Sequence, residues 1–273
     1  MIPVMFDYVR VGSLDEAIGA LSEHGDEAKL LAGGHSLLPL MKLRLATPSV
    51  LVDIGRLSEL SYVRDQGDHV AIGALTRHHD VQHDSVAVTQ APLLANVAGR
   101  IGDPQVRHRG TIGGSLAHAD PASDLPGAVL ALGGTLVARG PNGEREIPAT
   151  QFFEGFLETT LAPDEVLVEI RVPKATAGHS YQKFVRRSQD WAIVGVAVAR
   201  VGGQVGVSLV NVAATPVRAV AVEEALSSGA SAADAAEVAA EGLQPSGDNN
   251  ATPEFRRHLA RVLTRRALVE AGL

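Results

Sequence analysis

The chain contains no cysteine among its 273 residues. Disulfides, thiol catalysis and iron–sulfur clusters ligated by this chain are therefore excluded, whereas clusters on a partner protein remain open. No run of eighteen apolar residues is present, so the sequence predicts no membrane span. The opening stretch MIPVMFDYVRVG has neither the basic flank nor the apolar run of a signal peptide, and we expect a cytoplasmic protein.

An excess of positive charge is also missing. The formal net charge is −7, and the isoelectric point is about 5.8. A protein that binds the phosphate backbone of a nucleic acid usually carries a basic domain, so nucleic acid is disfavoured as a partner. What the chain does have is apolar residues, 45% of the total, which is enough to bury a core in one to three domains.

The first sixty residues alternate between strand and helix patterns. Residues 6–11 alternate like a strand, and the helix that follows has Ser13 as a suitable N-cap, with Glu16 three positions later. Short apolar strands are predicted at 28–34 and 49–55. This order predicts a small unit in which strands and helices pack in layers.

The rest of the sequence shows two further patterns. Hairpins are predicted at 60–75 and 135–149, with a mostly helical stretch between them. From about residue 178 the pattern changes to a meander of antiparallel strands, followed by helices. The sequence therefore predicts an α+β protein with two or three subdomains.

Two glycine-rich stretches stand out, GGHS at 33–36 and HRGTIGGSLAHADPASDLP at 108–126. Glycine permits positive φ and lets backbone N–H groups approach a ligand, and successive N–H groups form a concave anion site. Lys29, just upstream of the first stretch, adds positive charge. Turns at 33–36 and 113–115 would together hold a pyrophosphate from two sides, which suits a dinucleotide cofactor.

Neither stretch matches a known phosphate or nucleophile signature. The patterns G-x-G-x-x-G, G-x-x-x-x-G-K-[ST] and G-x-S-x-G do not fit them, which disfavours a Rossmann domain, a P-loop and a hydrolase nucleophile. For either stretch alone, an ordinary turn explains the glycines equally well. Lys29 before the first stretch and Asp124 within the second favour a ligand site over two ordinary turns.

The two stretches together resemble a known family. AGGHSLLPLMKLRLATPSVLVDI, followed about eighty residues later by GTIGGSLAHADPASDLP, resembles the FAD-binding medium subunit of molybdenum hydroxylases. The similarity spans essentially the whole chain, including YQKFVRRSQDWAIVGVAV. The family includes xanthine dehydrogenase and the aerobic carbon monoxide dehydrogenases, and the medium chain of the latter is the group that the sequence resembles most.

The resemblance implies a fold and a division into domains. It implies a two-subdomain FAD-binding fold of the vanillyl-alcohol-oxidase/PCMH type at 1–177, with subdomains at about 1–60 and 61–177. A C-terminal flavoprotein domain at 178–273 would contain a three-stranded antiparallel sheet and helices. FAD would lie extended between the first two subdomains.

The resemblance also implies the residues that contact FAD. The loop 32–36 would wrap the pyrophosphate between Lys29 and Leu37, and 111–115 would form the second pyrophosphate turn. The complete set is Lys29, Ala32, Gly33, Gly34, His35, Ser36, Leu37, Ile101, Thr111, Gly113, Gly114, Ser115, Asp124, Leu167, Lys183 and Trp191.

Five residues of this set, Ile101, Asp124, Leu167, Lys183 and Trp191, would contact other parts of FAD. Asp124 would accept hydrogen bonds from a ribose or ribityl hydroxyl, and Ile101 and Leu167 would pack against a ring. Lys183 would lie near the isoalloxazine carbonyl edge and stabilise the reduced, anionic flavin. Trp191 would stack on the flavin where many relatives have tyrosine. Without the resemblance, Lys183 would be interpreted as a surface charge and Trp191 as a core aromatic.

The function that the resemblance implies is electron transfer within a larger complex. A large subunit would hold molybdenum–cytosine dinucleotide, a small subunit two [2Fe–2S] clusters, and this chain FAD, in a dimer of heterotrimers. Electrons would leave to an external acceptor such as a quinone or a carrier, with no catalytic acid–base residue in this chain. A peripheral position at the inner face of the membrane is an alternative to free diffusion in the cytoplasm.

Two alternative functions stay open at this point. One is the medium subunit of a xanthine or aromatic-heterocycle dehydrogenase, and the other is a stand-alone FAD oxidoreductase of related fold. A binding protein with a degenerate flavin site is disfavoured because both glycine turns are intact.

Histidines raise a separate question about metals. His79 and His83 in RHHDVQHD are four residues apart and would share a helix face, beside His78. The pattern is not H-E-x-x-H and no further ligand is indicated, so we favour a solvated helix face and predict no metal site. For His35 we favour a positioning role over a covalent link to flavin, since the family resembled binds flavin without one.

Overall fold

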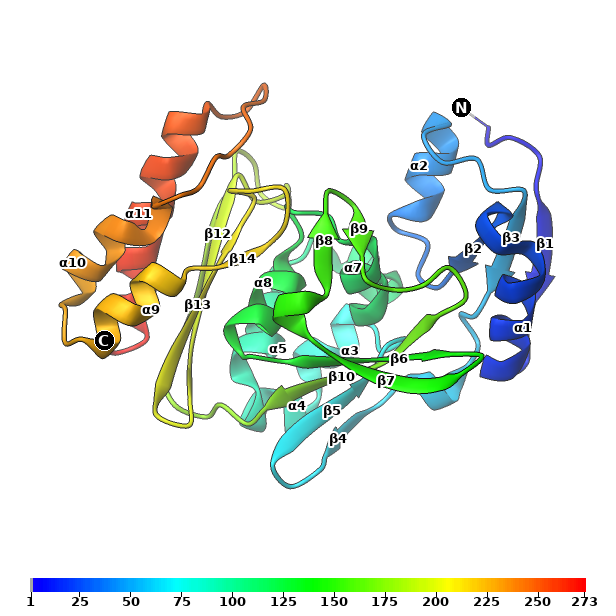
Figure 1. Cartoon of the computed structure of the whole chain (residues 1–273), viewed down its shortest axis with the longest axis horizontal. Helices are drawn as coiled ribbons and strands as arrows, with labels where there is room; N and C mark the ends of the chain where they lie inside the picture. Colours follow the sequence, from blue (N-terminus) through cyan, green and yellow to red (C-terminus); the bar gives the residue numbers. More distant parts are fainter. Residues whose placement is uncertain (1) are drawn as a thin grey trace.

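The structure is a computed structural model that describes residues 2–273, and Figure 1 shows three parts arranged in a row. The N-terminal part is a parallel sheet with the strand order β1-β3-β2. Its elements are β1 (Asp7–Arg10), α1 (Leu14–His24), β2 (Ala28–Leu31), α2 (Leu37–Leu43) and β3 (Val50–Asp53). The predicted N-cap is confirmed, because Ser13 Oγ accepts a hydrogen bond from Glu16 N at 3.2 Å.

The middle part is an antiparallel sheet with the order β4-β5-β10-β6-β7, packed against helices. Its strands are β4 (Val63–Asp65), β5 (His69–Gly73), β6 (Thr135–Gly140), β7 (Gly143–Pro148) and β10 (Val166–Pro173), and β8 (Phe153–Gly155) and β9 (Glu158–Thr159) form a separate hairpin. Its helices are α3 (His78–His83), α4 (Ser85–Gln90), α5 (Pro92–Gly99), α6 (Pro104–Arg109), α7 (Ile112–His118) and α8 (Asp124–Ala131). Both predicted hairpins are confirmed as the pairs β4–β5 and β6–β7.

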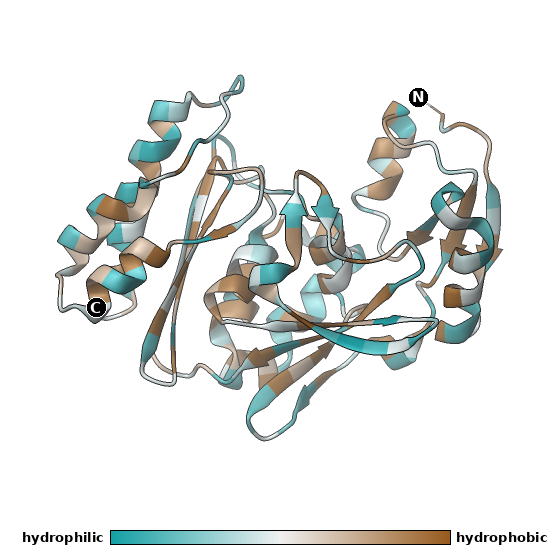
Figure 2. Ribbon diagram, in the orientation of Figure 1, coloured by the Kyte–Doolittle hydropathy of each residue, from teal (hydrophilic) through white to brown (hydrophobic). Residues whose placement is uncertain are grey.

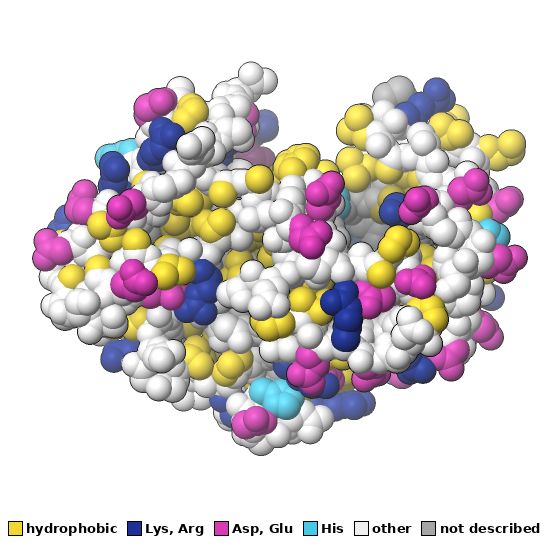
Figure 3. Space-filling view, viewed as in Figure 1, with side chains coloured by type: hydrophobic (Ala, Val, Ile, Leu, Met, Phe, Trp, Pro, Cys, Tyr) yellow, Lys and Arg dark blue, Asp and Glu magenta, His cyan; other side chains and the backbone are white. Residues whose placement is uncertain are grey.

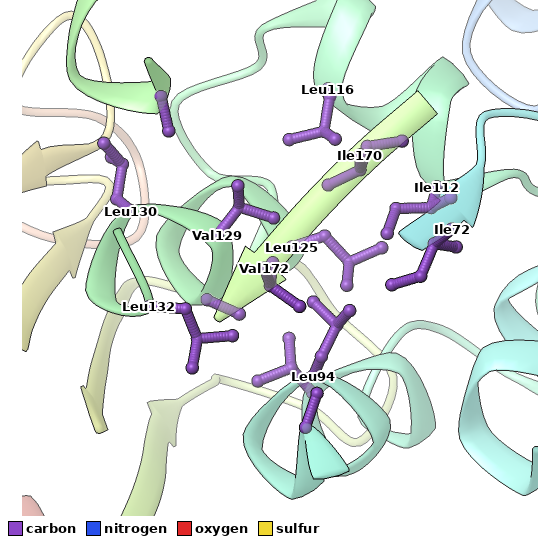
Figure 4. Packing of buried hydrophobic residues seen from close by; sticks show 14 of the residues in the cluster. Ile72, Leu94, Ile112, Leu116, Leu125, Val129, Leu130, Leu132, Ile170 and Val172 are labelled. Atoms are coloured by element: carbon purple, nitrogen blue, oxygen red, sulfur yellow. The ribbon is translucent and has the colours of Figure 1, made fainter. Parts of the chain in front are cut away.

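A single apolar core joins this sheet to its helices (Figure 4). Ile72 of β5 and Ile170 of β10 point toward Leu94 of α5 and Leu125 of α8, and all four are fully buried. Each such side chain contributes about 1.5–3 kcal/mol when it is removed from water. In Figure 2, hydrophobic segments, drawn in brown, recur along the strands of this sheet. This packing fixes α7 and α8 relative to the sheet, and therefore fixes the glycine-rich stretch between α6 and α8.

The C-terminal part combines an antiparallel sheet with three helices. Its elements are β11 (His179–Phe184), β12 (Val194–Val201), β13 (Gln204–Val210), β14 (Val217–Arg218), α9 (Val220–Ser227), α10 (Ala232–Glu237) and α11 (Pro253–Glu270). The three long strands agree with the three-stranded sheet that the resemblance implies, and the two-residue β14 adds a fourth.

Both faces of this C-terminal sheet are buried. Ala197 and Ala199 of β12 belong to the middle core, whereas Val196 and Val198 pack against the C-terminal helices. Successive side chains of a strand point to opposite faces, so one strand serves both cores. The C-terminal part therefore shares a core with the middle part, and the boundary near residue 178 stays a prediction. No helix within residues 2–273 has the length and apolar character needed to cross a membrane.

Candidate functional site

A cavity of about 840 Å³ lies where the three parts meet. Figure 3 shows it as a hollow between the part that carries α2 and the β8–β9 hairpin. Every residue that the sequence analysis assigned to FAD lines this cavity, from Lys29 and the bend at 32–37 to Lys183 and Trp191. The fold therefore brings the predicted set together, while the role of each residue stays a prediction.

The two glycine-rich bends are in direct contact. A side chain at Gly33 would overlap the carbonyl oxygen of Arg109 and lie 3.0 Å from Gly110 Cα. His35 Nε2 lies 3.5 Å from the carbonyl oxygen of Gln105. Segments about eighty residues apart in sequence thus meet at one end of the cavity, and Gly33 is the residue that lets their backbones approach.

The first bend presents unpaired donors. Gly34 has φ of +77°, and the chain turns there from β2 into α2. Within the described part of the chain, residues 2–273, the N–H groups of the five residues 33–37 have no hydrogen-bond acceptor. Consecutive backbone N–H groups around a bend form a site for an anion. The Ser36 side chain caps no N–H of α2, so its hydroxyl is a further donor.

The second bend is built differently from what the sequence suggested. The N–H groups of residues 112–115, at the start of α7, point into the protein and donate to acceptors there. The bonds are Ile112 N to Thr76 O at 3.0 Å, Gly113 N to Ala74 O at 2.8 Å, Gly114 N to Thr111 Oγ1 at 3.1 Å and Ser115 N to Thr111 O at 3.0 Å. Because the N–H groups of residues 112–115 all have acceptors, this bend offers a side-chain-free wall at Gly114 rather than a set of free donors.

A buried ion pair forms another wall of the cavity. Lys183 Nζ donates to Asp124 Oδ2 at 2.8 Å and to the carbonyl oxygen of Arg100 at 3.3 Å. The Tyr181 hydroxyl donates to Asp124 Oδ1. Burial raises the pKa of Asp124, and the nearby Lys183 charge opposes that rise. Each carboxylate oxygen thus accepts one hydrogen bond from a protein side chain, and the contact of Asp124 with a sugar hydroxyl stays a prediction.

The other predicted residues line the cavity without such partners. Leu167 is buried and Ile101 half-buried, and both present apolar surface to it. Trp191 is 58% exposed at its rim, two residues after Gln189, which has a left-handed φ of +72°. Lys29 is exposed at the other end of the cavity. The core-aromatic interpretation of Trp191 is therefore wrong.

His78 is one of the cavity residues that sequence reasoning missed. It was expected on a solvated helix face, but only 5% of it is exposed and it lines the cavity. Its Nδ1 is buried and has no hydrogen-bond partner within residues 2–273. Val81, three residues on, is fully buried, and this i, i+3 spacing was the signal that His78 faces inward.

The burial of His78 makes stability depend on pH. Burial, aided by the charges of His35, Arg77 and Arg107, lowers the pKa of His78 from 6.5 to about 4. Between these values the unfolded chain binds a proton that the folded chain does not, so stability falls as the pH drops from about 6.5 to 4. The full loss of stability from this residue is about 3 kcal/mol.

We expect denaturant titrations at pH 7 and pH 5 to show a smaller drop in the free energy of unfolding for His78→Gln than for the wild type. Equal drops in the two proteins would contradict the lowered pKa of His78.

His79 and His83 lie in a surface stack of histidine rings that also includes His108. The rings of His79 and His83 lie 4.4 Å apart, and His79 stacks on His108 at 4.0 Å between ring centroids. Among residues 2–273 no group of three histidine, aspartate or glutamate side chains has the geometry to hold a metal ion.

Comparison with known proteins decides the family. Residues 4–175 match the model of the FAD binding domain in molybdopterin dehydrogenase, and residues 179–271 match that of the CO dehydrogenase flavoprotein C-terminal domain. The chain belongs to the FAD-binding medium subunits of molybdenum hydroxylases. This medium subunit is thus part of an oxidoreductase, and its own cofactor is FAD.

Individual relatives cover the medium subunit from end to end. It is 41% identical over 279 residues to the carbon monoxide dehydrogenase medium chain of Hydrogenophaga pseudoflava, a match that covers 98% of this chain and 97% of that protein. It is 37% identical to the glyceraldehyde dehydrogenase medium chain of Sulfolobus acidocaldarius, with 100% of both chains covered. The solved structure of carbon monoxide dehydrogenase from Hydrogenophaga pseudoflava matches with a TM-score of 0.96 and 43% identity, over 100% of this chain and 99% of that one.

Proposed function

We propose that this medium subunit is the electron-transfer subunit of a heterotrimeric molybdenum hydroxylase of the aerobic carbon monoxide dehydrogenase kind. The observation that carries the proposal is the bend at 33–37, where five consecutive N–H groups without protein acceptors line a cavity of about 840 Å³. An anionic diphosphate is the part of a dinucleotide that such donors bind. The residues present therefore fit FAD.

Different residues that line the cavity would contact different parts of FAD. The bend at 33–37 would donate to the diphosphate, and Gly114 would let the cofactor approach α7 closely. Ile101 and Leu167 would exclude water from a ring, and Lys183 would place a positive charge near the isoalloxazine. When bound, FAD supplies the exchange between one-electron and two-electron carriers.

The proposal assigns the other redox centres to partners. This chain has no cysteine, so iron–sulfur clusters must be ligated elsewhere. A small subunit would carry two [2Fe–2S] clusters and a large subunit the molybdenum–cytosine dinucleotide, in a dimer of heterotrimers. Carbon monoxide is the substrate we propose for the complex, with a xanthine or aromatic heterocycle as the alternative. The quinone or carrier that accepts electrons and the cytoplasmic location stay predictions.

The test compares the complex with and without its flavin. We expect the chain, co-purified with its large and small partner subunits, to release one FAD per chain on denaturation. Carbon monoxide should reduce the iron–sulfur clusters of both the complete and the FAD-depleted complex, whereas only the complete complex should pass electrons to a quinone. Equal quinone reduction by both would contradict the proposed role of this subunit.

Two control experiments separate the alternatives. If xanthine or an aromatic heterocycle, but not carbon monoxide, bleaches the flavin of the complete complex, the chain serves a heterocycle dehydrogenase. If the chain alone with FAD is reduced by a small substrate, it is a stand-alone oxidoreductase.

A further inference from the structure

Tyr181 joins the cavity to the C-terminal sheet without lining the cavity itself. It is 2% exposed, and its hydroxyl donates to Asp124 Oδ1. Tyr181 and Lys183 lie two residues apart on β11, so their side chains leave the same face of the strand. Asp124 is the first residue of α8 and receives both of them. Two elements, β11 of the C-terminal sheet and α8 of the middle part, thus meet at a single carboxylate.

The geometry leaves Lys183 with little freedom. Its ammonium group donates to Asp124 Oδ2 at 2.8 Å and to Arg100 O at 3.3 Å, which uses two of its three donors. The side chain of Lys183 is 7% exposed and that of Asp124 is 6% exposed, so water screens their charges weakly. The position of the positive charge at the cavity wall therefore depends on where Asp124 is held.

Tyr181 holds Asp124. A carboxylate with only one fixed oxygen can rotate, and a buried carboxylate that loses a donor becomes easier to protonate. The Tyr181 hydroxyl fixes Oδ1 while Lys183 occupies Oδ2, so both the orientation and the charge of the carboxylate are set. The three groups form one unit with no net charge, a neutral tyrosine with a carboxylate and an ammonium.

We propose that Asp124 and Tyr181 are positioning residues that set how much positive charge Lys183 presents to the flavin. The inference rests on the proposed function, since it needs FAD in the cavity. Lys183 alone would favour the reduced flavin strongly because reduction adds negative charge to the ring system. Asp124 offsets part of that effect, and Tyr181 keeps Asp124 ionised and in place. The trio would thereby keep the flavin potential between those of its electron donor and acceptor.

The test measures the ratio of reduced to oxidised flavin at a fixed electrode potential in the complete complex. We expect Asp124→Asn to raise this ratio at least tenfold and Lys183→Met to lower it at least tenfold, which is about 30 mV for a two-electron couple. Tyr181→Phe should raise it about threefold, or about 15 mV on the same scale, because part of Asp124 becomes protonated. Tyr62→Phe is the matched control, since the Tyr62 hydroxyl donates to Glu169 Oε2 at 2.6 Å outside the cavity.

The readouts separate this inference from the proposed function. A wild-type complex without FAD overturns the function itself. If the complex holds one FAD per chain but Tyr181→Phe and Tyr62→Phe have the same flavin reduction potential, only the inference is overturned. A shift of the flavin potential in the opposite direction in Tyr181→Phe also overturns only the inference. Loss of FAD from Tyr181→Phe but not from Tyr62→Phe also overturns it, because Tyr181 is assigned no part in retaining FAD. If Asp124→Asn does not fold, the comparison of Tyr181→Phe with Tyr62→Phe still tests the inference.

Discussion

Gly33→Ala is expected to weaken the binding of FAD to the medium subunit while leaving the rest of the fold in place. A Cβ at this position overlaps the carbonyl oxygen of Arg109 and lies 3.0 Å from Arg109 C and Gly110 Cα. These neighbours are backbone atoms, which cannot rotate away, so the two bends must separate. Overpacking of this kind costs about 1–3 kcal/mol. When this cost is subtracted from the free energy of FAD binding, the affinity for FAD falls about five- to 150-fold.

The measurement is the FAD content of the purified complex after dilution and gel filtration, together with the melting temperature. Gly19→Ala is the matched control, because a Cβ at Gly19 of α1 meets nothing within 4 Å. Gly19→Ala should retain full FAD and gain slightly in stability, since alanine favours helix over glycine. If Gly33→Ala keeps as much FAD as Gly19→Ala, the contact between the bends is not needed for binding the cofactor.

Lys183→Met is expected to destabilise the FAD-free protein by about 3–5 kcal/mol, because it leaves the Asp124 carboxylate buried without its cation. Both side chains are less than a tenth exposed and pair at 2.8 Å. Lys174→Met removes a comparable pair with Asp65 at 2.6 Å, where the side chains are 25% and 43% exposed. Exposed pairs contribute about 0–1 kcal/mol, so the control should change little.

Chemical denaturation of the FAD-free chain measures both changes without a contribution from cofactor binding. The double variant Lys183→Met/Asp124→Asn should recover part of the loss, since it removes the unpaired charge as well. If Lys183→Met and Lys174→Met lose the same free energy of unfolding, the buried pair carries no special cost, and Lys183 is solvated through the cavity.

Several elements of the fold could be predicted from local signals. The N-cap at Ser13 and the two hairpins need only neighbouring residues, and each is present as expected. The cofactor residues could be assembled because both glycine stretches occur in a recognisable order, although they lie about eighty residues apart. All of them line one cavity.

The hydrogen bonds at these residues could not be predicted. Glycine at 113 and 114 is compatible both with free N–H donors and with donors turned into the protein. The latter holds because Ala74 and Thr76, near the end of β5, supply acceptors to the start of α7. Likewise, Asp124 accepts hydrogen bonds from Tyr181 and Lys183 because the first residue of α8 lies beside β11. Such partners come from distant segments that no local pattern reveals.

The sequence by itself determined the family, the α+β class, the absence of cysteine ligands and the two bends at which a dinucleotide would bind. These follow from residue types and short-range spacing, which are properties of the chain before it folds. Tertiary structure alone decided that the N–H groups of residues 33–37 have no acceptor within residues 2–273 whereas those of residues 112–115 have one, that His78 faces inward, and that Lys183 is held by a buried carboxylate. The reason is physical: burial and hydrogen-bond partnership depend on which distant segments pack together, and these two conditions set the charge and the free donors of the site.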